Sequence, residues 1–201
     1  MTSVNRQDKV IYIHIPKCAR SSIEKVDWLG GAGHVTYRHL QNKYTMKNFF
    51  VFTSVRNPLD RLVSAYHHFV DYPLKPNESQ ADQNCYKMIK RHQDRHKDKT
   101  LGGFPAFINK FPKKLLTTIN HFRPQRYFLE DNHGNINIDY IMTVRELQVS
   151  FNEVCIILDK ERCELSNTKT STHLPYEEYY NTKTCKIVRA LYKDDYKEQL
   201  W

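Results

Sequence analysis

Two short runs of β-branched and aromatic residues near the start of the chain have the pattern of buried strands. Residues 10–15 read VIYIHI and stop at Pro16, and residues 48–55 read NFFVFTSV and stop at Arg56-Asn57-Pro58. Continuous apolar runs of this length, bounded by proline or turn residues, are typical of strands that are covered on both faces. A third run at 137–144, NIDYIMTV, follows the turn-forming stretch at 131–135 and predicts another strand.

Helical spacing follows the second strand. Pro58 suits a first helical turn, and the apolar residues after it recur three and four positions apart: Leu59, Leu62, Val63, Tyr66, Phe69 and Val70. Further helices are expected from Ile23 onward and over residues 104–111, 115–122, 149–158 and 176–196. Residues 73–103 begin with two prolines and end at a Gly-Gly pair, which predicts an exposed helical excursion or a mobile flap.

Strands that alternate with helices predict an α/β fold with a central parallel sheet flanked by helices. The chain has 201 residues, which suffices for one sizeable core but is short for two. Neither an internal repeat nor a linker interrupts it, so we expect a single domain over residues 1–201.

Composition and charge restrict the possible classes of binding partner only in part. Hydrophobic residues make up 40% and charged residues 26%, as in an ordinary globular protein, and the net charge is +9. That charge favours anionic partners: nucleic acid, an acidic membrane, a phosphorylated cofactor or an acidic polysaccharide. No apolar run approaches the roughly 20 residues needed to span a bilayer, and the polar start lacks the apolar stretch of a signal peptide. We therefore expect no membrane span and a cytoplasmic location.

The cysteines and histidines do not form a metal-binding pattern. Five cysteines are scattered without a C-x-x-C pair, which predicts reduced thiols, although Cys155 and Cys163 could pair across a short loop. His92 and His96 have a four-residue spacing but no third ligand accompanies them. No metal is expected.

The loop after the first strand carries the most chemistry. Residues 17–22 lie between a predicted strand and a predicted helix, where backbone N–H groups and the helix dipole favour an anion. Lys17 adds a full charge, and Ser21 and Ser22 add hydroxyl donors. The loop is not a Walker A sequence. An ordinary strand–helix turn with an exposed lysine would account for the same residues.

A second cation follows the second strand. Arg56 stands where that strand ends, and Ser64 lies eight residues later on the predicted helix. The carboxyl ends of neighbouring parallel strands share one crevice, where ligands bind. Lysine suits phosphate as a point charge and arginine as a bidentate partner, so Lys17 and Arg56 together predict a ligand with two phosphate-like groups.

These two segments resemble those of the sulfotransferases. Residues 16–22, PKCARSS, resemble the family's 5′-phosphosulfate loop, commonly P-K-T/C-G/A-G-T-S/T. Residues 55–66, VRNPLDRLVSAY, resemble its 3′-phosphate segment, R-[DN]-P-x-x-R-x-x-S-x-Y. Later stretches at 139–141, 151–155 and 175–196 are similar to those of carbohydrate sulfotransferases. The resemblance thus covers nearly the whole chain.

The resemblance implies a P-loop-like fold and 3′-phosphoadenosine 5′-phosphosulfate (PAPS) as the cofactor, with no metal. It implies that the phosphosulfate is bound by the loop residues, namely Lys17, Cys18, Ala19, Arg20, Ser21 and Ser22, and the 3′-phosphate by Arg56 and Ser64. Lys169 and Thr170 stand where related enzymes have a polar loop that closes over the nucleotide. One residue departs from the pattern, because Arg20 occupies a position where the family usually has glycine. Its side chain is expected to point outward or to add a charged contact.

A histidine is the candidate base. Residues 33–37, GHVTY, resemble the G-H-V-[ST]-Y segment of the uronyl 2-O-sulfotransferases, which implies that His34 takes the acceptor proton. An imidazole with a pKa near 6.5 suits that role at neutral pH. His34 is also one of ten histidines and lies in a glycine-rich turn. His14 is expected in the core, and His67 and His68 are expected to face solvent or neighbouring helices.

The acceptor is the least determined partner. Residues 87–99 are strongly basic, which indicates either a solvated helix face or a surface for an acidic glycan. A carbohydrate hydroxyl is favoured, while a small alcohol or a tyrosyl peptide stays open. The competing functions are a kinase-like phosphotransferase, a nucleic-acid-binding module and a sulfotransferase fold without turnover. The first lacks a Walker A loop and the second a recognisable nucleic-acid-binding motif, so no nucleic acid is expected.

Overall fold

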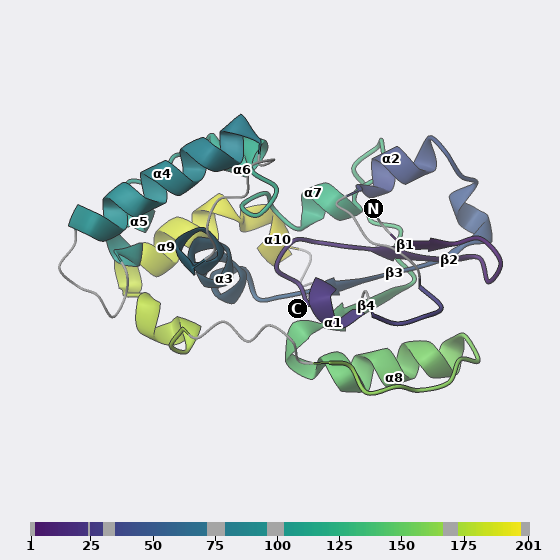
Figure 1. Cartoon of the computed structure of the whole chain (residues 1–201). Coiled ribbons are helices and arrows are strands. Elements are labelled where there is room, and N and C mark those ends of the chain that lie inside the picture. Colours follow the sequence, from purple (N-terminus) through teal and green to yellow (C-terminus); the bar gives the residue numbers. More distant parts are fainter. Residues whose placement is uncertain are drawn as a thin grey trace. The chain divides into compact units, whose positions relative to one another are not determined.

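The two most apolar runs of the sequence form the centre of a sheet in the computed structural model, which describes residues 3–23, 25–29, 35–71, 79–95, 103–166 and 173–197 (Figure 1). Strands β2 (Val10–Ile13) and β3 (Phe50–Val55) pair in parallel, and β4 (Tyr140–Thr143) pairs in parallel with β3. At the edge, β1 (Ser3–Asn5) pairs antiparallel with β2, so the sheet order is β1-β2-β3-β4. The predicted α/β class with a largely parallel sheet is confirmed.

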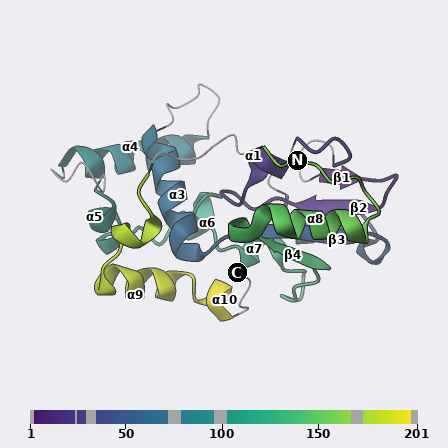
Figure 2. The ribbon, with the colours of Figure 1, turned by 90° about the horizontal axis from the view of Figure 1, so that it is seen from below.

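Side chains alternate between the two faces of this sheet, and helices cover both faces. Ile11, Ile13, Val51 and Val55 pack with residues of α2 (Tyr37–Gln41) and α7 (Arg126–Leu129). The other face packs against α8 (Leu147–Ile157), which Figure 2 shows lying along the sheet. There Val10, Tyr12, Phe52 and Met142 of the strands share a buried cluster with Phe151, Val154 and Cys155 of α8. Because the strands are covered on both faces, they read as continuous apolar runs.

The chain divides into two compact units. The first comprises Met1–Arg56, Pro124–Thr170 and Gln199–Trp201 and contains the sheet; the second comprises Asn57–Arg123 and Ser171–Glu198. In its described residues the second unit is helical, with α3 (Pro58–Asp71), α4 (Gln80–Arg95), α5 (Phe104–Asn109), α6 (Leu115–Thr118), α9 (Thr182–Leu191), α10 (Lys193–Lys197) and the 3₁₀ turn η3 (Tyr176–Tyr179). Its core is rich in aromatic rings, among them Tyr66, Phe104, Phe107 and Phe122. That all 201 residues act as a single domain stays a prediction.

Several predicted elements differ in extent. The helix expected from Ile23 onward is instead α1 (Arg20–Ile23), which begins earlier and has four residues. The tail expected as one helix over 176–196 is broken, because Asn181 caps α9 through a reciprocal capping box with Thr184. In the predicted excursion, α4 is helical, but it is not wholly exposed, since Cys85 and Ile89 are buried in the core.

Other elements were not predicted from the sequence. They are β1, α2, α7 and two 3₁₀ turns, η1 (Met46–Asn48) and η2 (Val144–Glu146). η1 occupies the start of the predicted strand at 48–55, which begins at Phe50. These elements are short, and short elements carry little periodicity from which to recognise them.

The cysteines are all thiols, Cys155 and Cys163 included, so the alternative pairing of these two is not formed. Within the described ranges no three histidine, cysteine or carboxylate side chains form a metal-binding group. Among the helices of those ranges, none is long and apolar enough to cross a membrane.

Candidate functional site

The loop after β2 has an unusual backbone. After β2 ends, His14, Ile15 and Pro16 stay buried, and the chain turns through Lys17 at φ 68° and Ala19 at φ 58° before α1 begins at Arg20. The turn is closed where the Cys18 N–H donates to the Ile15 carbonyl at 3.2 Å and the Ser22 N–H donates to the Ala19 carbonyl at 3.1 Å. Left-handed residues in a short turn gather backbone N–H groups into a concave site that suits an anion.

The positive φ angles that favour glycine lie at other positions than Arg20 in this loop. The left-handed residues are Lys17 and Ala19, whereas Arg20 has no positive φ and opens α1. The Arg20 side chain is exposed, which agrees with the expectation that it points outward. Glycine is therefore not required by the backbone at position 20, and Ala19 carries the strained conformation instead.

Arg56 lies beside this loop. β2 and β3 run parallel with Ile13 opposite Thr53, so their carboxyl ends open at the same edge of the sheet. A guanidinium nitrogen of Arg56, Nη1, comes within 3.5 Å of the Lys17 carbonyl oxygen. The structure thus brings together the lysine-bearing loop and the arginine that the sequence pointed to.

Polar residues beneath the loop hold it in place, and sequence reasoning did not identify them. Ser54 donates its hydroxyl to the Cys18 carbonyl at 2.6 Å, and its oxygen lies 2.6 Å from the Tyr12 hydroxyl. Gln125, fully buried, bonds both to the Cys18 thiol and to the backbone of Arg56. Ser54 could have been recognised from the sequence, because it is a polar residue inside an apolar strand and buried polar groups need hydrogen-bond partners. Nothing comparable marks Gln125.

The remaining predicted site residues fall into three groups. Ser64 is buried within α3 and belongs to the second unit. His34, Lys169 and Thr170 lie outside the described residues. Ser21 and Ser22 lie half-buried in α1, next to the loop. The binding roles of all these residues stay predictions.

Two further histidines, both on α3, pack against other rings rather than facing solvent. The His67 ring stacks on His173 with centroids 5.0 Å apart and meets Tyr179 edge-on, and the His68 ring stacks on His121 at 4.5 Å. Burial lowers the pKa of His67 below its ordinary 6.5; Asp71 opposes this effect and His173 adds to it. His14 is buried, as expected for a core residue.

Arg61, the second arginine of the segment at 55–66, is buried in the second unit. Its side chain is 2% exposed and donates to the carbonyl of Arg123 at 2.8 Å and to that of Asn120 at 3.5 Å. It therefore anchors the end of the first stretch of the second unit, Asn57–Arg123.

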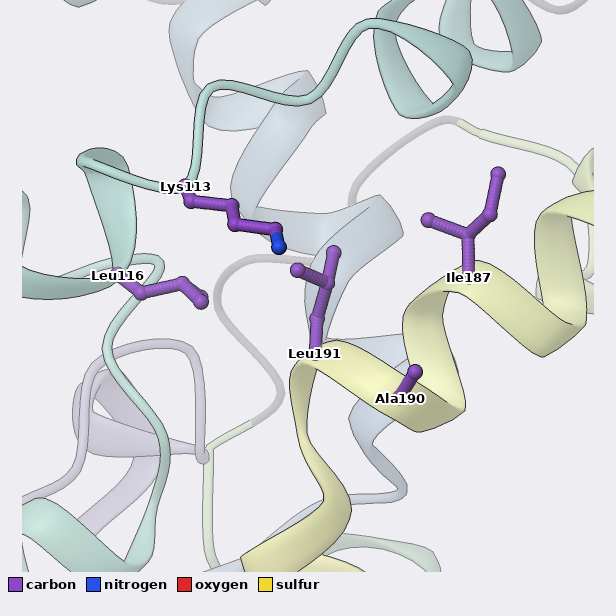
Figure 3. Close-up of a pocket in the computed structure, with 5 residues that line it drawn as sticks. All are labelled: Lys113, Leu116, Ile187, Ala190 and Leu191. Atoms are coloured by element: carbon purple, nitrogen blue, oxygen red, sulfur yellow. The ribbon is translucent and has the colours of Figure 1, made fainter.

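An open recess in the second unit contains none of the predicted site residues. It lies between the segment at α6 and one side of α9 and is lined by Lys113, Leu116, Ile187, Ala190 and Leu191 (Figure 3). Four of these side chains are aliphatic, so the recess lacks the paired cations and hydroxyl donors of the loop after β2.

A largely parallel α/β sheet with a lysine-bearing loop and an arginine at one edge is an arrangement that suits a phosphorylated ligand. The chain belongs to the sulfotransferase family: the model of that family matches residues 32–198. No curated protein and no solved structure matches the chain. The match begins after the loop at 17–22, so it includes Arg56 but not Lys17.

Proposed function

We propose that this sulfotransferase uses PAPS and transfers its sulfuryl group to a hydroxyl of a carbohydrate. Membership of the family supports sulfuryl transfer in general. The observation that carries the finer proposal is the position of Arg56, whose Nη1 lies within 3.5 Å of the Lys17 carbonyl at the shared carboxyl edge of β2 and β3. A loop with one cation and an adjacent arginine suits a nucleotide that has two separate phosphate groups.

The chain's own residues fit that ligand. Lys17 and the backbone of the left-handed turn would hold the 5′-phosphate, and Arg56 would hold the 3′-phosphate. When bound, PAPS supplies a sulfuryl group whose bond to the 5′-phosphate oxygen breaks as the bond to the acceptor oxygen forms. Lys17 would then stabilise the negative charge that develops on the phosphate. We assign His34 as the base that takes the hydroxyl proton.

The acceptor we propose is an acidic glycan, and α4 offers a surface that suits one. Lys87, Arg91 and Arg95 are exposed and stand four residues apart. At a rise of about 6 Å per four residues, they form a row of positive charge along one side of the helix. Such a row attracts a polyanion in a salt-dependent manner.

A titration with adenosine 3′,5′-bisphosphate, ATP and a random-sequence oligonucleotide tests the nucleotide assignment. We expect binding of the bisphosphate with a dissociation constant on the order of micromolar, much weaker binding of ATP, and loss of bisphosphate binding in Arg56→Ala. The matched control is Lys47→Ala, which removes the same charge from η1, at the opposite end of β3.

Three other results of this titration would contradict the proposal. Equal affinity for ATP would indicate a kinase-like phosphotransferase, and preferential binding of the oligonucleotide would indicate a nucleic-acid-binding module. Bisphosphate binding that is indifferent to Arg56→Ala, or equally weakened by Lys47→Ala, would show that general charge rather than the sheet edge binds the ligand.

A further inference from the structure

We infer that Gln125 is a positioning residue that sets the separation between the phosphosulfate loop and Arg56. The inference rests on the proposed function, because it concerns how the two phosphate-binding segments are held relative to each other. Gln125 lies far from both segments in the sequence, and its side chain is fully buried. The amide contacts each segment directly.

The first contact extends the pairing of β3 beyond its last residue. The Arg56 N–H donates to Oε1 of Gln125 at 2.9 Å, and Nε2 of Gln125 donates to the Arg56 carbonyl at 2.9 Å. The side-chain amide thus satisfies both backbone groups of Arg56, as a residue of a neighbouring strand would do. This fixes the backbone from which the guanidinium extends.

The second contact reaches the loop. The Cys18 thiol donates to the same Oε1 of Gln125 at 3.3 Å, so one oxygen accepts from both phosphate-binding segments. On its other side, the Cys18 carbonyl accepts from Ser54 of β3 at 2.6 Å. Cys18 stands between the two left-handed residues, Lys17 and Ala19, so holding Cys18 holds the turn.

Burial makes this junction sensitive to substitution. Because Gln125 has no exposed surface, water does not readily replace a hydrogen bond lost here, and the two segments lose the partner that they share. A ligand that contacts both segments depends on their separation, whereas a ligand that contacts only the loop does not. The role of Gln125 should therefore appear as a difference between two ligands.

The experiment compares adenosine 3′,5′-bisphosphate with adenosine 5′-monophosphate in Gln125→Met, which keeps the length of the side chain and removes its hydrogen bonds. We expect the dissociation constant of the bisphosphate to rise about tenfold or more and that of the monophosphate to change less than about threefold. The control is Thr53→Val, which removes a buried hydrogen bond of 2.8 Å from Thr53 to the Ile13 carbonyl without touching Cys18 or Arg56. This variant should leave both dissociation constants unchanged.

A second pair of variants keeps the test decisive where Gln125→Met does not fold. Cys18→Ser retains a donor to Oε1 of Gln125, and Cys18→Ala removes it. We expect Cys18→Ser to preserve the preference for the bisphosphate over the monophosphate and Cys18→Ala to reduce it. Equal preference in the two Cys18 variants would contradict a role for this contact.

The outcomes separate the two proposals. Wild-type protein that does not bind the bisphosphate overturns the proposed function, and the inference with it. If the wild type binds the bisphosphate but Gln125→Met retains it fully, or loses both ligands by the same factor, the proposed function stands and the positioning role is wrong.

Discussion

Replacing Ala19 by glycine should stabilise the protein. Ala19 has φ 58°, a left-handed conformation that costs a residue with a Cβ atom about 1–2 kcal/mol and glycine almost nothing. Glycine loses more conformational freedom on folding, and this loss lowers the free energy of unfolding by about 0.5–1 kcal/mol. The difference leaves a net gain of about 0.5–1 kcal/mol, or a rise of about 1–4 °C in the unfolding midpoint for a chain of this size.

The assay is thermal unfolding followed by circular dichroism, with urea unfolding as a second measurement. The matched control is Arg20→Gly, one residue further along the same loop. Because Arg20 has no positive φ and opens α1, glycine relieves no strain there and only adds freedom to the unfolded chain. We expect Ala19→Gly to raise the midpoint and Arg20→Gly to leave it unchanged or lower it. The reverse order would show that the glycine-requiring position is 20, as the family pattern suggested, and would refute the backbone argument.

Two further predictions concern histidines. His34→Ala should leave bisphosphate binding within about twofold of the wild type and lower turnover on uronic-acid oligosaccharides at least about a hundredfold, the usual contribution of a general base; unchanged turnover would remove His34 from the mechanism. Burial holds the pKa of His67 below 6.5, so the unfolded chain takes up this proton first and stability is lost as pH falls below 6.5 toward the folded-state pKa. Thermal midpoints measured between about pH 7.5 and about pH 5.5 should therefore fall less steeply in His67→Gln than in the wild type, and parallel curves would argue against this account.

The sequence predicted the parts of the fold that periodicity encodes. The strands at Val10–Ile13 and Phe50–Val55 are covered on both faces, so burial itself produced the apolar runs from which they were predicted. The long helix α3 showed the spacing of one buried side. The edge strand β1 escaped prediction because it is short and two of its three residues are polar, and the break before α9 depends on a cap rather than on periodicity.

The candidate site likewise contains residues that the sequence pattern predicted and residues that it did not. Lys17 and Arg56 were predicted because each follows a strand, and parallel strands bring such residues to one edge. Gln125 was not predicted, because its partners are backbone groups and a thiol that lie far away in the sequence. The likeness to a family motif also placed the need for glycine at Arg20, since a motif reports which residues occur and not which φ each adopts.

The hydrogen bonds at this edge tie the loop to the part of the chain that defines the family. The matched residues, 32–198, include Ser54, Arg56 and Gln125 but exclude the loop at 17–22. All three reach that loop, Ser54 and Gln125 at Cys18 and Arg56 at the Lys17 carbonyl. Buried polar groups of a turn need hydrogen-bond partners, and here the partners of the Cys18 carbonyl and thiol come from the family segment. The loop and Arg56 are therefore fixed to each other by hydrogen bonds, which is what the proposal of one ligand for Lys17 and Arg56 requires.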